Sequence, residues 1–330
     1  MIARTYVNGV IAAKEKYFLK EKLLRLIETD AENALRALKE SGFGGAAAAA
    51  EENCSAETLI AAQEAETNAF IREYAASEAE KEYFLSPLDC HNVKAYFKAA
   101  CTGADVTNML ADEGLVPLSR IQESFLKDDY SALPAYLQSA VREAKKICKD
   151  GAAGKGAEIG AAFEKALFYH LAVVLKKHVA LKQLLAEKAD LTNLVTALRA
   201  ANFEKAKEQF VCGGKLRAED YAFCFAENAE QAESLARKTG ASGKAGARMR
   251  DLFDIYKRVK ETGSYAEAEK RLAQTELDFF ERKKYELTGS DPFLYYVLRR
   301  KTECADVRIA LVCLNAGMKE SEIKKRLRGV

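Results

Sequence analysis

The chain has 330 residues, of which 49% are hydrophobic, and it carries 51 Lys and Arg against 49 Asp and Glu. This length and apolar fraction allow a sizeable buried core, divided among two or three packed units. Because the charges nearly cancel, no overall field is available to hold a nucleic acid backbone, and we expect no nucleic acid partner.

The composition predicts an all-α protein. Only four prolines occur and there is no Trp, while Ala, Leu, Glu, Lys and Arg are abundant. Long windows of good helix formers are therefore left uninterrupted.

The first predicted helical stretch runs from Thr5 to Leu38, where the spacing of the apolar residues favours helix over strand. It stops at the Gly-rich segment 41–45. The Ala run at 46–50 is either a flexible link or the start of the next helix. A charged, Ala-rich helix is predicted from Ala56 to Phe84.

Ser86 and Pro87 then predict a helix start, with Ser as the N-cap and Pro in the first helical position. A further helix fits Asp129 to Lys149, and the Gly-rich segment 150–156 breaks the chain after it. Neither Gly nor Pro occurs from Ala161 to Ala201, which would allow one helix of about 60 Å.

Two further features complete the chain. The Gly/Ser-rich segment 241–248 predicts a loop. Asp291 and Pro292 begin the last long helix, which Gly317 ends.

One short pattern recurs three times at wide and nearly even intervals: an acidic residue followed three positions later by Asn or Asp. The copies are Asp89 with Asn92, Asp190 with Asn193, and Glu303 with Asp306. Each is followed by an apolar stretch and then by a Gly turn, at 114, at 213–214 and at 317. A unit repeated three times indicates threefold pseudosymmetry, which suits docking around an axis better than bond cleavage.

The pattern has both a structural and a functional interpretation. Asp89 lies beside the predicted helix start at Ser86 and would there serve as a cap. Asp190 and Glu303 fall inside predicted helices, where residues three apart share a face, so their polar spots either pair internally or face a partner. For Glu303, Arg299 and Arg300 offer a local salt bridge.

No catalytic arrangement is recognisable. The Gly-rich segment 150–157 lacks the Gly and Ser/Thr positions of a phosphate loop. Cys90 and His91 are neighbours on a helix and point about 100° apart, so they cannot act as a nucleophile and base pair. The eight cysteines contain no Cys-x-x-Cys spacing and are interpreted as small buried hydrophobes. We therefore expect no cofactor, no metal, no small-molecule substrate and no enzymatic activity.

Membrane insertion is not expected either. The most apolar window, Ala166 to Leu175, is half of the roughly 20 residues that a membrane span requires. The first residues show no apolar segment of the kind found in secretory signals, so we expect a cytoplasmic protein. Basic clusters such as 299–301 and 324–326 are interpreted mostly as solvated faces.

The carboxy-terminal region resembles a known family. The run from Asp291 to Val297, followed by Lys301, Glu303, Asp306 and Arg308, is similar to the closing signature of one family of V-type (A-type) ATPase subunits. Archaeal and bacterial members are known as the C subunit, and eukaryotic members as the d subunit. In that family a Lys-x-Glu-x-x-Asn-x-Arg motif lies in the last long helix, and here Asp306 stands where Asn is usual. The earlier copies resemble the same pattern, and the opening helices up to Gly44 resemble those of the family.

The resemblance implies an all-α, funnel-shaped bundle of three pseudo-repeated helical units, with boundaries near 1–125, 126–225 and 226–330. It implies a non-catalytic central-stalk (rotor) subunit that caps the membrane proteolipid ring and holds the central axle. A protein in this position couples ATP hydrolysis or synthesis to H⁺ or Na⁺ transport and touches the membrane only through the ring. The residues predicted to line or stiffen the axle socket are Asp89, Asn92, Lys94, Asp190, Asn193, Arg199, Lys301, Glu303, Asp306 and Arg308.

Two other functions remain open at this level. A helical repeat scaffold unrelated to rotary ATPases would usually show a period of 20–50 residues, whereas these copies lie about 100 residues apart. An enzyme that uses Cys90 or Cys212 as its nucleophile would lose activity on thiol alkylation.

Overall fold

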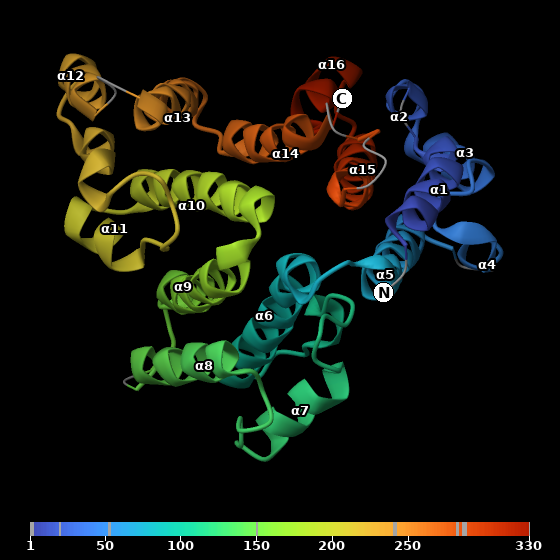
Figure 1. The fold of residues 1–330 in the computed structure, drawn as a ribbon, viewed down its shortest axis with the longest axis horizontal. Coiled ribbons are helices and arrows are strands. Elements are labelled where there is room, and N and C mark those ends of the chain that lie inside the picture. Colours follow the sequence, from blue (N-terminus) through green and yellow to red (C-terminus); the bar gives the residue numbers. More distant parts are fainter. Residues whose placement is uncertain are drawn as a thin grey trace. The chain divides into compact units, whose positions relative to one another are not determined.

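The computed structural model describes residues 3–19, 21–51, 54–149, 151–239, 243–281, 284–285 and 289–329. Every regular element in these residues is a helix, so the predicted all-α class is confirmed (Figure 1). The contacts divide the chain into two compact units, Met1–Glu78 with Glu269–Val330, and Ala79–Ala268. The funnel shape, the threefold symmetry and the three sub-repeat boundaries stay predictions.

The first unit is organised around the last long helix, α15, which packs against α1, α3, α5 and α16. Its helices include α1 (Arg4–Lys14), the 3₁₀ turn η1 (Glu15–Tyr17), α2 (Glu21–Leu26), α3 (Ala31–Glu40), α4 (Gly45–Ala49), α5 (Ala56–Tyr74), α15 (Asp291–Asn315) and α16 (Glu320–Arg326).

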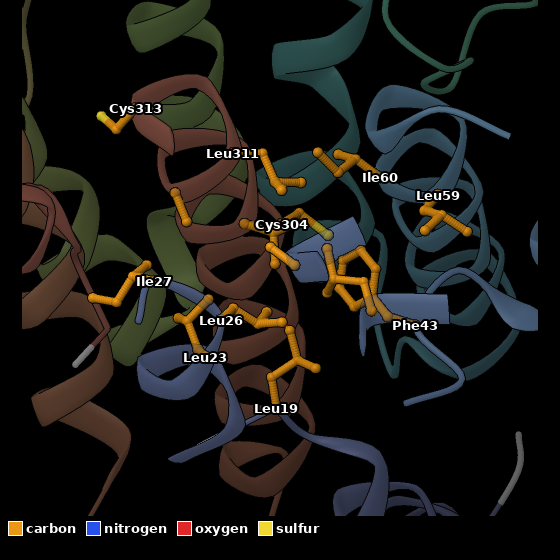
Figure 2. Packing of buried hydrophobic residues seen from close by; sticks show 14 of the residues in the cluster. Leu19, Leu23, Leu26, Ile27, Phe43, Leu59, Ile60, Cys304, Leu311 and Cys313 are labelled. Atoms are coloured by element: carbon orange, nitrogen blue, oxygen red, sulfur yellow. The ribbon is translucent and has the colours of Figure 1, made fainter. Parts of the chain in front are cut away.

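The core of this unit joins distant parts of the sequence. Leu19, Leu23 and Ile27 of the amino-terminal segment lie against the face of α15 that carries Cys304 and Leu311 (Figure 2). A second, aromatic contact joins α5 to α15, where the Phe70 ring stacks on Phe293 at a centroid distance of 5.8 Å. Burial of these apolar side chains is the main force that holds the unit together.

The second unit extends from α6 to the start of α14. Its elements are α6 (Glu78–Thr102), η2 (Thr107–Met109), α7 (Leu118–Leu126), α8 (Ala135–Ile147), α9 (Gly156–Val174), η3 (Leu175–Lys177), α10 (Val179–Arg199), α11 (Phe203–Gln209), η4 (Ala218–Phe225), α12 (Ala229–Thr239), α13 (Gly243–Thr262) and the first residues of α14 (Ala266–Glu281). One of its cores lies where α6, α7, α8 and α9 meet, around Val93, Ile121, Leu137 and Phe163.

The amino-terminal prediction was right about helix but not about continuity. The stretch from Thr5 to Leu38 is three α-helices, because Phe18 adopts an extended conformation and Asp30 caps α3 by accepting a hydrogen bond from the Asn33 N–H. The Ala run after Gly44 forms the short helix α4. The helix predicted to end at Phe84 ends at Tyr74, and Phe84 belongs to α6.

The predicted helix start at Ser86 and Pro87 is wrong. Helix α6 begins at Glu78 and continues through Pro87, and the Ser86 hydroxyl donates to the Glu82 carboxylate instead of capping. Tyr83, Phe84 and Leu85 are all buried. Their burial keeps the helix continuous despite the cost of an internal Pro, about 3 kcal/mol.

The long helix predicted from Ala161 to Ala201 is also wrong, because it is broken at η3. His178 ends the first part and caps the second: its Nδ1 accepts a hydrogen bond from the Leu181 N–H. The Nε2 atom then carries the proton and lies 3.7 Å from the buried carboxylate of Glu80. A His in this role is a helix breaker that counting Gly and Pro does not detect.

Of the remaining helix boundaries predicted from the sequence, some are confirmed and others are wrong. Residues 243–248 are helical rather than loop, whereas residues 241 and 242 of that prediction lie outside the described residues. Helix α8 starts only after Pro134. The last long helix begins at Asp291 and ends before Gly317, as predicted. Among the described helices, none combines the length and the apolar character that crossing a membrane would require.

Candidate functional site: three buried carboxylate clasps

The recurring polar residues lie inside three long helices, α6, α10 and α15. All six side chains are buried, with exposed fractions from 0% to 4%. Asp89 lies in the middle of α6, so helix capping is wrong as an explanation for it. Buried polar groups of this kind need internal hydrogen-bond partners, which the structure provides in each case.

In the first copy, the partners come from the loop that leads into α7. The two oxygens of Asp89 accept hydrogen bonds from the N–H groups of Leu115 and Val116, at 2.9 and 3.0 Å. Asn92, one turn further along α6, accepts from the Ala111 N–H at 2.8 Å and donates to the Asp112 carbonyl at 3.2 Å. The pair thus fixes the returning loop to its own helix. We call this arrangement a carboxylate clasp.

The second copy repeats the arrangement. Oδ1 of Asp190 accepts from the N–H groups of Lys215 and Leu216, at 2.9 and 3.1 Å. Asn193 accepts from the Val211 N–H at 2.8 Å and donates to the carbonyl of the same residue at 3.0 Å. Asn is required at this position because the loop presents both a donor and an acceptor to it.

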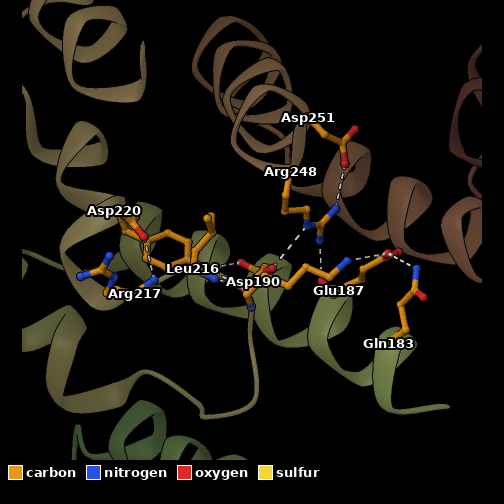
Figure 3. A network of polar contacts seen from close by, with 10 residues as sticks. Gln183, Glu187, Asp190, Leu216, Arg217, Asp220, Arg248 and Asp251 are labelled. Atoms are coloured by element: carbon orange, nitrogen blue, oxygen red, sulfur yellow. Dashed lines mark hydrogen bonds and ion pairs between the residues drawn. The ribbon is translucent and has the colours of Figure 1, made fainter. Parts of the chain in front are cut away.

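A buried arginine completes the second clasp. Arg248 reaches from α13 toward α10, where its Nε lies 3.5 Å from Oδ2 of Asp190 and its Nη2 donates to the Glu187 carbonyl (Figure 3). Its Nη1 donates to Asp251 at 2.8 Å. Burial raises the pKa of Asp190, and the backbone donors and Arg248 oppose that shift.

The third copy uses the same chemistry with different partners. Here the second residue forms the clasp: the oxygens of Asp306 accept from the N–H groups of Arg328 and Gly329, at 2.6 and 2.8 Å. A carboxylate suits this place because both partners are donors. Burial raises the pKa of Asp306, against the effect of these donors.

Glu303 holds the amino-terminal segment instead of a loop of its own. Its Oε1 accepts from the Leu19 N–H at 2.8 Å, and its Oε2 pairs with Arg300 at 3.0 Å. Arg300 also donates to the Tyr17 carbonyl at 3.1 Å, and burial raises the pKa of Glu303. The predicted local salt bridge is therefore present, with Arg300 as the partner.

A glycine lies against the carboxylate in all three clasps. A Cβ atom on Gly114 would lie 2.5 Å from the Leu85 carbonyl and would collide with the Asp89 carboxylate. One on Gly214 would collide with the Asp190 carboxylate, and one on Gly329 would lie 3.0 Å from Asp306. Two of the glycine turns predicted from the sequence take this role. In the third copy Gly329 does so, and Gly317 only ends the helix.

The other four predicted site residues have charged groups that lie nearer the surface than the six buried side chains of the recurring pattern. They are Lys94, Arg199, Lys301 and Arg308. Arg308 forms ion pairs with Glu57 at 2.6 Å and Glu64 at 3.3 Å, of which the hydrogen bond to Glu57 does most to raise its pKa. The Arg199 guanidinium lies 4.4 Å from the centroid of the Tyr265 ring. Lys301 donates to Asn68 at 3.4 Å. Lys94 is half-buried and, within the described part of the chain, forms neither a hydrogen bond nor an ion pair.

The structure also weakens the thiol-nucleophile alternative. Burial raises the pKa of the Cys90 thiol to about 12, and burial raises that of Cys212. A thiol becomes a nucleophile as the thiolate, which these shifts disfavour at neutral pH. All eight cysteines are free, and five of them are buried.

Among the partners that sequence reasoning missed are Arg248, the Tyr221 hydroxyl, which donates to Oδ1 of Asp190 at 3.3 Å, and the backbone of Leu19. Arg248 lies in a Gly/Ser-rich segment that predicted a loop, and Leu19 lies inside a stretch that predicted continuous helix. The signal for Leu19 would have been a break in the helix near Phe18, which the apolar spacing does not reveal.

The fold and the clasps define a class: an all-helical protein whose buried carboxylates bind its own backbone. A family model for the ATP synthase (C/AC39) subunit matches residues 7–326. The chain therefore belongs to that family, a structural rather than catalytic subunit of V/A-type ATPases. A comparison with curated proteins finds no match. Membership of this family excludes the alternative hypothesis of a helical scaffold unrelated to rotary ATPases.

Proposed function

We propose that this chain is the rotor adaptor of a V/A-type ATPase. It caps the proteolipid ring on the cytoplasmic side, holds the foot of the central axle, and so couples ATP hydrolysis or synthesis to H⁺ or Na⁺ transport. The observation that carries this proposal is the family match over residues 7–326.

The clasps suit such a mechanical role. An adaptor that transmits torque must keep its loops and helices in fixed register under load. A hydrogen bond to a charged group contributes about 1.5–3 kcal/mol, more than a neutral one, and these carboxylates each hold two backbone groups or a paired arginine. We therefore assign Asp89, Asp190, Glu303 and Asp306 to bracing the body rather than to contact with the axle.

We assign contact with the ring or the axle to those predicted site residues whose charged groups are accessible to solvent. Lys94 has a half-buried side chain and no ion-pair partner among the described residues, so its ammonium is available to an acidic group of the ring or axle. Arg308 is 40% exposed and is already paired with two glutamates. Exposed charges at the edge of an interface set specificity and association rate more than affinity.

Omission of the chain from a reconstituted ATPase tests the proposal. The soluble head, the axle and the ring would be assembled in vesicles with and without it, and both ATP hydrolysis and ion uptake would be measured. We expect hydrolysis to persist without the chain while ion uptake is lost, and purified chain to restore uptake. Full ion uptake without the chain, or a folded chain that binds neither ring nor axle, would contradict it.

A further inference from the structure

Three of the eight cysteines have thiols that reagents in solution can reach. Cys101 and Cys212 are exposed and Cys148 is half-buried, so the interpretation of the cysteines as buried hydrophobes is wrong for these three. A buried thiol behaves as a small apolar group, whereas an accessible one is open to oxidation and to disulfide exchange. Redox chemistry of the folded chain is therefore expected at Cys101, Cys148 and Cys212.

Two of these three thiols contact each other. The side chains of Cys101 and Cys148 are within hydrogen-bond contact, although all of helix α7 separates them in the sequence. Cys101 lies in the last turn of α6, and Cys148 is the residue at which α8 ends. Within the described part of the chain, Cys212 has no second thiol beside it. Two accessible thiols in contact are the arrangement from which a disulfide forms.

The core of the second unit holds these two thiols together. Phe97 lies one turn before Cys101 on α6, and Ala144 lies one turn before Cys148 on α8. Both are buried in the core where α6, α7, α8 and α9 meet, and Cys148 packs against that core. Residues four apart share a helix face, so each thiol lies on the side of its helix that is buried there. The contact between the thiols thus follows from the packing of two helices.

Both helices lead into turns that allow the thiols to approach further. Gly103 and Gly151 follow the two cysteines closely and have positive φ angles of 70° and 101°. Among the described residues, no atom lies within 4 Å of a Cβ placed on either glycine, so the turns are open. A disulfide requires a distance of about 2.05 Å between its sulfurs. The adjustment that brings them so close involves helix ends and open turns, and the core stays in place.

We propose that Cys101 and Cys148 form a reversible disulfide, with a low-molecular-weight disulfide as the oxidant. The exposed Cys101 thiolate attacks one sulfur of the small disulfide, which leaves a mixed disulfide on Cys101 and releases one small thiol. The Cys148 thiolate then attacks the Cys101 sulfur and releases the second small thiol. Two protein thiols are oxidised and one small disulfide is reduced, and the two departing thiolates take up the two protons that the protein thiols lose.

This bond ties the carboxyl end of α6 to that of α8. It closes a loop that contains η2 and α7, together with the Leu115 and Val116 amides that Asp89 holds. The first clasp and the disulfide therefore restrain the same segment, one by hydrogen bonds and the other covalently. A crosslink lowers the entropy of the unfolded chain, so the oxidised form is the more stable one. The redox state of the surroundings thereby changes the stability of the second unit.

Exchange of the purified full-length chain with oxidised and reduced glutathione tests the proposal. Burial and the contact with Cys148 raise the pKa of Cys101, so the reaction is followed at about pH 9, where more of the thiol is ionised. Acid-quenched samples would be digested, and their disulfides identified by mass spectrometry. We expect the bond between Cys101 and Cys148 to be the dominant product and dithiothreitol to reverse it, while Cys212 carries only glutathione.

Serine variants and an unfolded control make the result specific. In Cys101→Ser and in Cys148→Ser the remaining thiol should end as a mixed disulfide, whereas Cys212→Ser should leave the pair unaffected. In urea, the ratio of the intrachain bond to the mixed disulfide should fall at least about tenfold, because the fold no longer holds the thiols in contact. Oxidation should raise the thermal unfolding midpoint of the unaltered chain by about 5–10 °C, but not that of Cys148→Ser.

Three results would overturn the disulfide proposal. The first is a folded chain in which Cys101 and Cys148 stay reduced or end only as mixed disulfides at about pH 9. The second is an equal ratio of intrachain bond to mixed disulfide in the folded and the unfolded chain, and the third is a bond that leaves the unfolding midpoint unchanged. The proposed rotor function is independent of all three, because the experiment uses the chain alone.

Discussion

Replacing Asp190 by Ala is expected to lower the free energy of unfolding by about 3–5 kcal/mol. The substitution leaves the N–H groups of Lys215 and Leu216 without their acceptor in a buried site. It also takes a counter-charge from Arg248, which is only 9% exposed. An unsatisfied buried donor costs about 1–3 kcal/mol, so the two backbone donors alone account for most of the expected loss.

Urea denaturation followed by circular dichroism measures this loss. Asp254→Ala is the matched control, because Asp254 is exposed and pairs with Lys257 one turn away. The control should change stability by less than about 1 kcal/mol, as for other exposed ion pairs. Equal effects of the two substitutions would show that the buried clasp contributes nothing particular.

Replacing Gly114 by Ala is expected to destabilise the chain by about 2–4 kcal/mol, although Ala is otherwise a mild substitution. The new methyl group would collide with the Asp89 carboxylate and the Leu85 carbonyl, neither of which is the end of a flexible chain. The loop must move away, and its hydrogen bonds to Asp89 are then lost. Gly214→Ala should behave in the same way against Asp190.

Gly160→Ala is the control for both glycine substitutions. Gly160 lies inside α9, and no atom outside its own helix lies within 4 Å of a Cβ placed there. Since Ala is the better helix former, this variant should gain up to about 1 kcal/mol. Thermal or urea unfolding of the three variants would separate the steric effect from helix propensity, and a neutral Gly114→Ala would refute the collision.

The helical class could be predicted from composition and apolar spacing, but the helix boundaries depended on tertiary contacts. Pro87 predicted a helix start by its local preference, and the buried face of α6 around Phe84 and Leu85 overrides that preference. His178 carries no breaker signal of its own. His178 breaks the helix because its ring caps α10 and lies close to the carboxylate of Glu80.

The recurring acidic pattern was recognisable in the sequence, whereas its partners were not. A carboxylate that binds backbone N–H groups leaves no trace in the side chains of the residues that donate, such as Leu115 or Leu216. The nearby glycines were the available signal, and two of the three predicted turns contained the correct residue. In the third copy the partner loop is replaced by the Arg328–Gly329 segment and by Leu19, which local reasoning does not connect.

The clasps give the recurring pattern a physical meaning in this chain. The pattern has Asn where a loop offers one donor and one acceptor, as at Asn92 and Asn193. It has Asp at 306, where the segment offers two donors. The polar residues of the recurring pattern thus describe how each long helix holds its neighbouring segment.

Hydrogen–deuterium exchange of the six donor amides tests this central claim most directly. They belong to Leu115, Val116, Lys215, Leu216, Arg328 and Gly329. We expect each to exchange about a hundredfold more slowly than an unprotected amide, and Asp89→Ala, Asp190→Ala and Asp306→Ala each to release only its own pair. Rapid exchange of these amides in the unaltered protein would contradict the claim that the recurring carboxylates clasp the backbone.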